Sequence, residues 1–332
     1  MRCRENSKAV IIHPGAVGDC LLSLPLADFM KKNLGVEQVD MIARQDYAHF
    51  YPGRTSIDRV RPMEAVPLHR LFVDNSAFEP QKGDRLIQAF AEYEHIVSFL
   101  GVGNRDFEQN LIFVAHCSHS ANVSFIEAVG TGRIHISECC LRQFTEQLGL
   151  EWPADFAVAQ KRISSLADDL PAGRERIAGF GIDTDKPLAM IQPGSGGREK
   201  CWAIENFLQV GDWLKQKGLA ACYLLGPVEE ERMGAENIAL LNQAGTVIRG
   251  LNLTGVVAAL SCSEMFLGND SGISHIAGAM GIKTAVVFGP SDPQVYRPLG
   301  PNVEIIQIPN ERFQTACEQD CKMVIDVLSK WL

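Results

Sequence analysis

The sequence predicts two α/β domains, each built on a parallel sheet. Short apolar runs alternate with helix-patterned segments along the whole chain, as in repeated βα units. The length of 332 residues is about twice that of a typical domain. Two apolar runs also continue into similar turns, VIIHPGAVGD at 10–19 and AMIQPGSGGREK at 189–200. Such sheets bind ligands beyond the carboxyl ends of their strands, so we expect a site in a cleft between the domains.

In the first half, apolar runs and helical periodicity set the expected elements. The expected strands are 9–13, 38–43, 69–73, 95–100 and 111–115, and the expected helices are 19–33, 81–92 and 137–148. A polar stretch, 159–186, is the expected linker, with a middle that can be helical. The first domain is therefore expected to span 1–170.

The second half repeats the alternation of strands and helices. Its expected strands are 188–192, 220–225, 246–249, 264–267, 283–288 and 303–308, and its expected helices are 204–217, 229–243, 254–261 and 271–280. We expect a second domain over 187–310 and one terminal helix over 311–332.

Composition excludes several classes of protein. The net charge of −9 means that the surface as a whole does not attract nucleic acid or anionic lipid. There is no apolar run of about 18 residues, as a membrane span requires, and the apolar run at 9–12 is too short for the core of a signal peptide. Ten cysteines without a CxxC pair favour a reducing, cytoplasmic compartment. Cys317 and Cys321 lie four residues apart, but too few further ligands accompany them to predict a metal site.

The segment GNDSG at 268–272 lies between a strand and a helix. Asp270, Ser271 and Gly272 begin that helix, where free backbone N–H groups and a partial positive charge can hold a phosphate. His275 lies one turn further on the same helical face as Ser271. For Asp270 alone, a simple helix N-cap is the alternative interpretation.

Two further loops follow buried strands of the second domain. The loop 193–200 places Ser195 and Lys200 among small residues, which suits a diphosphate; a solvated turn with surface charges is the alternative. Glu229 follows the next strand, where a carboxylate can accept hydrogen bonds from a ribose. The alternative is that Glu229 only favours the first turn of a helix.

The turn after the first strand carries His13, Gly15, Gly18 and Asp19. Its small residues leave room for a sugar beside the backbone. Asp19 is a candidate general base that would deprotonate an attacking hydroxyl. N-capping of the helix that begins here is the alternative role.

Together, HPGAVGDCLLSLPLADFMKK, PGSGGREKCW, LGPVEEER and GNDSGISHIAGAMGIKTAVVFGPSDP resemble the lipopolysaccharide heptosyltransferases, glycosyltransferase family nine. The four motifs have the order and spacing of the family and span nearly the whole chain. The resemblance implies a GT-B fold, α/β, in which two Rossmann-like, doubly wound parallel-sheet domains face a central cleft. It also implies that the terminal helix packs back on the N-terminal domain.

The resemblance implies an inverting transfer of heptose from ADP-L-glycero-D-manno-heptose, without metal or other cofactor. Asp19 matches the proposed base, Lys200 the lysine that contacts the diphosphate, and Glu229 the ribose-binding carboxylate. Asp270, Ser271, Gly272 and His275 match the donor-binding loop, with Ser195 beside it. His13, Gly15 and Gly18 lie on the acceptor side.

The expected partners are the nucleotide sugar and a lipid-linked glycan acceptor, with no nucleic acid. We expect a cytoplasmic monomer, which is compatible with peripheral contact at the inner membrane.

The sequence departs from the family at His13-Pro14-Gly15, where members often carry Arg-Pro-Gly or Thr-Ser-Ser. The basic residues on the acceptor side, Arg54, Arg59, Arg61, His69 and Arg70, are interleaved with acidic residues.

There are two alternatives to this function. One is a different donor or acceptor on the same fold, and the other is a non-catalytic nucleotide-sugar-binding protein. A nucleotide-sugar epimerase would need a full GxGxxG fingerprint and a Tyr-x-x-x-Lys pair, which the chain lacks.

Overall fold

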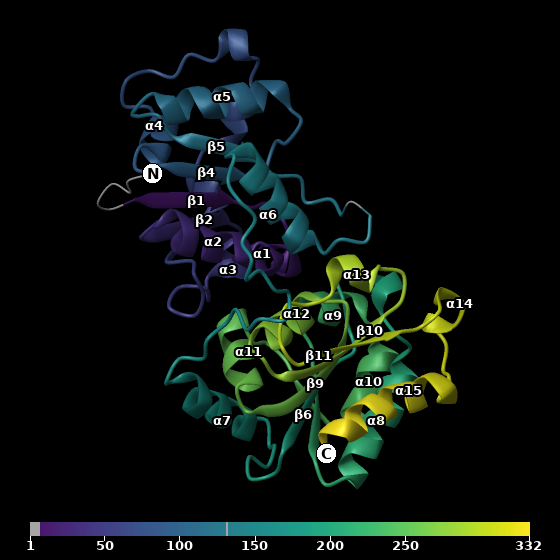
Figure 1. Ribbon diagram of the computed structural model, residues 1–332. Helices are drawn as coiled ribbons and strands as arrows, with labels where there is room; N and C mark the ends of the chain where they lie inside the picture. The colour runs from purple at the N-terminus through teal and green to yellow at the C-terminus, as the bar shows by residue number, and fades with distance from the viewer. Residues whose placement is uncertain (1–6, 131) are drawn as a thin grey trace. The chain divides into compact units, whose positions relative to one another are not determined.

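The computed structural model describes residues 7–130 and 132–332, and divides the chain into two α/β units, residues 1–156 and 157–332 (Figure 1). Each unit has its own parallel sheet. The fold class predicted from the alternation of strands and helices is confirmed for both units. The boundary between the units, after residue 156, lies earlier than the predicted end of the first domain at residue 170.

The sheet of the first unit has the strand order β3-β2-β1-β4-β5, with β1 at its centre. Its strands are β1 (Lys8–Ile12), β2 (Gln38–Ala43), β3 (Arg59–Pro62), β4 (His95–Ser98) and β5 (Asn122–Phe125). Its helices are α1 (Val17–Leu22), α2 (Leu24–Leu34), α3 (Gln45–Ala48), α4 (Arg85–Phe90), α5 (Arg105–His116) and α6 (Ile136–Gln147), with 3₁₀ turns η1 (Met63–Ala65), η2 (Leu68–Phe72) and η3 (Asn75–Ala77). Because β1 pairs with both β2 and β4, the turn after β1 emerges at the middle of the sheet edge.

Two strands predicted in the first unit are wrong. Residues 111–115 belong to α5, which buries Phe107, Leu111 and Val114 at helical spacing and is capped by the side chain of Asn104. Residues 69–73 fall mostly in η2. The strands β3 and β5 were not predicted, because RVRP and NVSF are short and only partly apolar.

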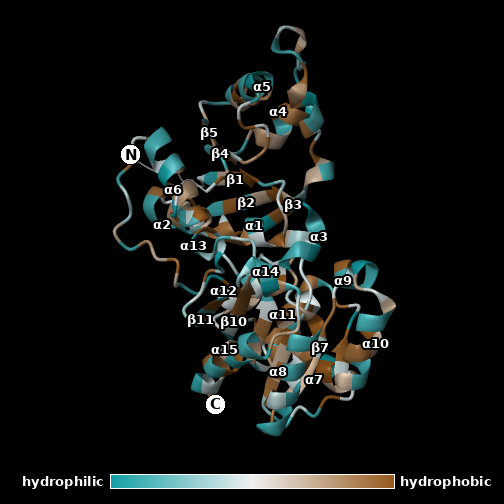
Figure 2. Ribbon diagram, turned by 90° about the vertical axis from the view of Figure 1, so that its right-hand side faces the viewer, coloured by the Kyte–Doolittle hydropathy of each residue, from teal (hydrophilic) through white to brown (hydrophobic). Residues whose placement is uncertain are grey.

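The second unit has a six-stranded sheet with the order β11-β10-β9-β6-β7-β8. Its strands are β6 (Leu188–Gln192), β7 (Ala220–Leu224), β8 (Thr246–Ile248), β9 (Ser263–Asn269), β10 (Lys283–Phe288) and β11 (Val303–Gln307). Its helices are α7 (Asp169–Gly179), α8 (Ile204–Gln216), α9 (Pro227–Arg232), α10 (Ala235–Ala244), α11 (Leu253–Leu260), α12 (Gly272–Ala279), α13 (Pro293–Tyr296), α14 (Asn310–Phe313) and α15 (Glu318–Leu328), with 3₁₀ turns η4 (Arg198–Lys200) and η5 (Ser329–Trp331). All six predicted strands are confirmed within one or two residues. Figure 2 shows strands of this sheet coloured as hydrophobic and helices carrying both hydrophobic and hydrophilic bands.

The expected linker, 159–186, is part of the second unit rather than a connection outside it. Its helix α7 packs on α11, and Gly173 allows the close approach, since a Cβ there would lie 2.0 Å from the carbonyl oxygen of Ala258. Arg162 and Ile163 both donate backbone hydrogen bonds to Ala279, at 2.9 and 3.0 Å. These contacts explain why the boundary falls near residue 156.

The terminal segment is not one helix, and it belongs to the second unit; its packing on the N-terminal domain stays a prediction. Its main helix, α15, packs on α8, β10 and β11 of the second unit and buries Cys321, Val324 and Leu328. Asn206 of α8 holds the start of this helix, because its side chain accepts a hydrogen bond from the backbone N–H of Cys317 at 2.8 Å. Cys321 also donates to that side chain, at 3.4 Å, so this cysteine packs in the core.

Within residues 7–130 and 132–332, no group of three His, Cys, Asp or Glu side chains is arranged to hold a metal ion. None of the helices in the described part of the chain is long and apolar enough to cross a membrane.

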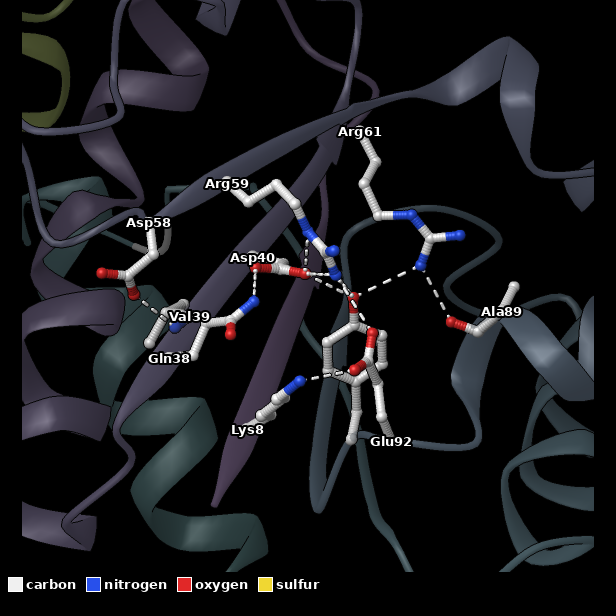
Figure 3. A network of polar contacts seen from close by, with 10 residues as sticks. Lys8, Gln38, Val39, Asp40, Asp58, Arg59, Arg61, Ala89 and Glu92 are labelled. Atoms are coloured by element: carbon white, nitrogen blue, oxygen red, sulfur yellow. Dashed lines mark hydrogen bonds and ion pairs between the residues drawn. The ribbon is translucent and has the colours of Figure 1, made fainter. Parts of the chain in front are cut away.

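A buried charge network ties β2 to β3 in the first unit (Figure 3). Asp40 is fully buried, and Arg59 donates to it through Nη2 and Nε, at 2.5 and 2.9 Å. Tyr93 and Gln38 donate further hydrogen bonds to Asp40, at 2.5 and 2.7 Å. Burial, together with the hydrogen bond to Asp40, raises the pKa of Tyr93 to about 12, so this hydroxyl remains a donor at neutral pH.

We expect Arg59→Ala to lower the free energy of unfolding by about 2 kcal/mol, because Asp40 stays buried without its cation but keeps its hydrogen bonds from Tyr93 and Gln38, and the lost arginine is 49% exposed. Urea denaturation followed by circular dichroism measures this change. Lys31→Ala is the matched control, since it removes only a surface pair with Asp58 and should cost about 1 kcal/mol or less. Equal, small losses in both variants would show that the buried network does not stabilise the unit.

Candidate active site

Three loops of the second unit meet at one edge of its sheet. The strands β6, β7 and β9 are neighbours and run parallel, so their carboxyl ends lie side by side. The loop 193–200 follows β6, Gly226 and α9 follow β7, and Asp270 follows β9. This edge therefore gathers most of the second-domain residues that the sequence identified.

Asp270 is the centre of the charged contacts at this edge. Its side chain is 8% exposed; Lys200 Nζ lies 2.7 Å from its Oδ2, and His275 Nε2 lies 3.7 Å from its Oδ1. Burial alone would raise the pKa of Asp270, but the contacts with His275 and Lys200 outweigh it and hold that pKa well below its usual range. The carboxylate is therefore ionised at neutral pH.

The N-cap of α12 is Ser271, and the alternative role of Asp270 as a cap is therefore wrong. The hydroxyl of Ser271 accepts the backbone N–H of Ser274 at 3.3 Å. Asp270 instead faces the loop that carries Lys200. Gly272 is the first residue of α12, and His275 lies one turn further along, buried. Among the described residues, Nδ1 of His275 is buried without a hydrogen-bond partner.

Lys200 and Ser195 join the loop after β6 to the loop after β9. Lys200 ends the short turn η4 and keeps 38% of its side chain exposed while it contacts Asp270. Ser195 is buried and donates to the backbone carbonyl of Asp270 at 2.6 Å. The loop 193–200 is therefore held against the start of α12, contrary to the interpretation of a solvated turn.

Glu229 is buried and makes two hydrogen bonds of different kinds. Its Oε2 accepts the backbone N–H of Gly226 at 2.9 Å, which is the role in the first turn of α9 that the alternative interpretation required. Its Oε1 accepts from the side chain of Gln192, also at 2.9 Å. Gly194 leaves the space for this carboxylate, since a Cβ there would lie 2.0 Å from Glu229 Cγ.

Two residues of this edge were missed from the sequence. Gln192 ends β6, and Asn269 ends β9. Asn269 accepts the backbone N–H of Trp202 at 2.9 Å and donates to the carbonyl of Pro193 at 2.8 Å, so it fixes the loop after β6 at both ends. The signal that identifies both is a polar residue at the last position of a strand that is otherwise buried and apolar.

In the first unit, the turn after β1 places His13, Gly15 and Asp19 in contact. His13 accepts the backbone N–H of Gly15 at Nδ1, 3.1 Å away, and its ring lies 4.4 Å from that of Phe99. Burial lowers the pKa of His13 to about 4, although the charge of Asp19 opposes the shift. His13 is therefore neutral at pH 7, with its proton on Nε2.

Asp19 is exposed and occupies the first turn of α1, next to Gly18. Asp19 is not the N-cap, which is Ala16; it is the third residue of the helix, and its Oδ2 accepts the backbone N–H of Ala16 at 3.0 Å, so it caps α1 from within the first turn. A Cβ at Gly15 would lie 2.7 Å from Asp19 Cβ and 2.7 Å from His13 Cε1. Glycine at this position is what lets the two side chains flank the turn.

Most arginines on the expected acceptor side are engaged in internal contacts. Arg70 forms a paired contact with Asp84, at 2.7 and 2.8 Å, and Arg61 donates to the carbonyl of Ala89. His69 instead lines a cavity of about 380 Å³ bounded by η1, η2 and Arg85. This cavity lies beyond the carboxyl ends of β3 and β4, at the same edge as the turn after β1.

The chain is similar in sequence to characterised heptosyltransferases. Residues 141–324 match the profile of glycosyltransferase family 9 (heptosyltransferase). Lipopolysaccharide heptosyltransferase 1 of Escherichia coli strain K12 is 22% identical over 92% of this chain and 95% of its own length. Lipopolysaccharide heptosyltransferase 2 of Salmonella typhimurium is 26% identical over 39% of this chain and 38% of its own length.

Solved structures share the fold. ADP-heptose lps heptosyltransferase II of E. coli superposes with a TM-score of 0.72 at 16% identity, covering 98% of this chain and 100% of that one. The family 9 glycosyltransferase of Veillonella parvula gives a TM-score of 0.70 at 16% identity, covering 98% and 97%. The fold is thus that of the GT-B heptosyltransferases, with two Rossmann-like parallel-sheet domains.

The matched segment, residues 141–324, covers more than half of the chain and includes every loop of the second-unit edge. The protein is therefore a glycosyltransferase and belongs to family 9, the heptosyltransferases.

Proposed function

We propose that this protein transfers a heptose, or a related sugar, from an ADP-sugar to a hydroxyl of a lipid-linked glycan such as the lipopolysaccharide inner core. The observation that carries the proposal is the contact of Lys200 with the ionised Asp270 at the start of α12. The E. coli heptosyltransferase WaaC has been solved with ADP and with ADP-2-deoxy-2-fluoro heptose, at 19% and 20% identity. These similarities support an ADP-sugar as the donor.

The donor would bind at the edge formed by β6, β7 and β9. Lys200 and the N-terminal N–H groups of α12 supply positive charge for a diphosphate. Asp270 holds Lys200 in place by their ion pair, so the ammonium is oriented before the substrate binds. Glu229 would accept hydrogen bonds from the ribose hydroxyls.

The chemical step would be a single displacement with inversion at the anomeric carbon. The acceptor hydroxyl forms the new C–O bond, its proton passes to Asp19, and the bond to the diphosphate breaks as ADP departs with the electron pair. The charge that develops on ADP would be stabilised by Lys200 and by the helix start. Asp19 commits Oδ2 to the N–H of Ala16, which leaves its Oδ1 for the proton.

A lipid-linked acceptor would bring the enzyme to the inner face of the inner membrane as a peripheral, monomeric protein. The cavity in the first unit offers the acceptor a mostly apolar surface with three polar side chains, Glu64, His69 and Arg85. Another donor sugar or acceptor on the same scaffold is the second candidate, because the residues around the acceptor differ from the family pattern at His13.

We expect ADP and ADP-heptose to raise the melting temperature, and a ligand at 100 times its Kd adds about 2.7 kcal/mol of stability. The shift should persist in EDTA, because none of the strands in residues 7–130 and 132–332 ends in a DxD motif; Asp183 and Asp185 lie in the loop after α7. Differential scanning fluorimetry with ADP-, UDP- and GDP-sugars tests both points. Protection by UDP- or GDP-sugars alone would overturn the donor assignment, and loss of protection in EDTA would overturn metal independence.

We expect Lys200→Ala to weaken ADP binding and to lower turnover by roughly 100-fold, because a preorganised cation at the leaving diphosphate is lost. Steady-state kinetics and calorimetric binding of ADP measure the two effects. Lys186→Ala is the matched control, since Lys186 is an exposed lysine of the same unit that pairs only at the surface with Asp183. If both variants kept native constants, Lys200 would have no role in the reaction.

We expect Asp19→Asn to lower kcat by roughly 10²–10⁴-fold and to leave ADP affinity nearly unchanged, because an amide cannot accept the proton. Asparagine still accepts the N–H of Ala16, so the cap of α1 is preserved. Turnover and ADP affinity of this one variant separate the two roles of Asp19. Near-native turnover would remove Asp19 from the mechanism and leave it only as a cap.

A further inference from the structure

Gln192 connects two of the three loops at the second-unit edge. It is the last residue of β6 and is 3% exposed. Its Nε2 donates to Glu229 Oε1 at 2.9 Å, and its Oε1 accepts from the hydroxyl of Ser271 at 2.5 Å. One buried amide thus joins the start of α9 to the start of α12.

The direction of these hydrogen bonds is fixed by the protons that each partner can offer. Ser274 uses its hydroxyl proton on the carbonyl of Asn269, at 2.6 Å. The hydroxyl of Ser271 lies 3.1 Å from Ser274 Oγ and 2.5 Å from Gln192 Oε1. The carboxylate oxygens of Glu229 can only accept, so the amide nitrogen of Gln192 must face Glu229 and the amide oxygen must face Ser271, which donates over the shorter distance. Glutamine presents an acceptor on one side and a donor on the other, which neither methionine nor an ionised glutamate does.

Glu229 is held in one orientation as a result. One oxygen receives the backbone N–H of Gly226 and the other receives Gln192, so each oxygen keeps free acceptor capacity. The carboxylate also lies across Gly194, where a Cβ would displace it. A fixed carboxylate with two free acceptor positions is suited to a pair of neighbouring hydroxyls, which a ribose offers and a 2′-deoxyribose does not.

We propose that Gln192 is a positioning residue that makes the nucleotide site selective for ribose over 2′-deoxyribose, by holding Glu229 with both oxygens available. This inference rests on the proposed function, in which Glu229 contacts the donor ribose. It assigns the selectivity to the pair Gln192 and Glu229 rather than to the carboxylate alone. Gln192 acts through Glu229 and needs no contact of its own with the nucleotide.

The first test replaces Gln192 with methionine, which has a similar length but cannot make either hydrogen bond. Calorimetry compares the affinity for ADP and for 2′-deoxy-ADP. The wild type should prefer ADP by about tenfold, as expected for one hydrogen bond to a charged acceptor. Gln192→Met should lose most of that preference, because binding of ADP weakens more than binding of 2′-deoxy-ADP, which offers Glu229 only its 3′ hydroxyl. Gln209→Met, the same exchange on the exposed face of α8, should keep the preference.

A second variant, Gln192→Glu, keeps the test informative if methionine unfolds the protein. The introduced carboxyl would face Glu229, and two close carboxylates share a proton with a raised pKa. When protonated, that carboxyl donates to Glu229 as the amide does, so selectivity should return as the pH falls from 8 to 5 and be lost as it rises. Lys200, Asp270 and His275 also lie at this edge. At each pH, the nucleotide affinity of the variant is divided by that of the wild type. This ratio cancels the effect on binding of titration at these three residues and at the ligand phosphates.

The outcomes separate the inference from the proposed function. If the wild type binds ADP with a preference that Glu229→Gln abolishes but both Gln192 variants retain, the positioning role is wrong and the donor site stands. A wild type that binds neither nucleotide overturns the proposed function itself. Loss of the preference in Gln192→Met together with its recovery at low pH in Gln192→Glu supports the inference, because a merely structural role would not give a pH-dependent ratio.

Discussion

Burial of polar side chains at the carboxyl edge of the second sheet is the constraint on which the site depends. A buried polar group must hydrogen-bond within the protein, because the cost of leaving it unpaired is about 1–3 kcal/mol. At this edge the hydrogen bonds join residues at the ends of different strands and in the loops that follow them. Asn269 holds the loop after β6, Ser195 holds the backbone of Asp270, and Gln192 connects Glu229 with Ser271. The loops are therefore ordered by one another, so little further ordering is needed when a nucleotide binds.

The repeated Pro-Gly turn has the same physical explanation in both units. In each, a carboxylate from the following elements crosses the turn where a side chain would otherwise stand. A Cβ at Gly15 would meet Asp19, and a Cβ at Gly194 would meet Glu229. Neither glycine has the positive φ that often requires glycine in a turn. The similarity of VIIHPGAVGD and AMIQPGSGGREK thus reflects a shared need to bring an acidic side chain against a strand end.

The sequence predicted most of the second sheet because runs such as 188–192 and 283–288 are apolar at almost every position. It failed where the spacing of apolar residues fits a strand as well as a helix, as at 111–115. It also failed where a strand is short and partly polar, as in β3. The contact of Cys317 with Asn206, distant in sequence, ties the start of α15 to α8, and no local pattern in the sequence predicts it. The candidate residues from contiguous motifs of the second domain lie together at one edge of its sheet. Gln192 was not identified from the sequence, because its role arises only when α9 and α12 approach the same strand end.

Three carboxylates, Asp270 and Glu229 of the second unit and Asp19 of the first, differ in what they can do. Asp270 is buried against Lys200 and His275, which hold its pKa well below the usual range, so it is a poor acceptor for a proton. Glu229 is buried with a hydrogen bond on each oxygen, which suits it to fixed contacts with a ligand. Asp19 is exposed, and its cap uses only one oxygen. A general base must take a proton and release it to solvent in every cycle, and exposure allows this. The hydrogen bond to Ala16 fixes the carboxylate without occupying its second oxygen, so this contact does not compete with the proposed role of Asp19 as the base.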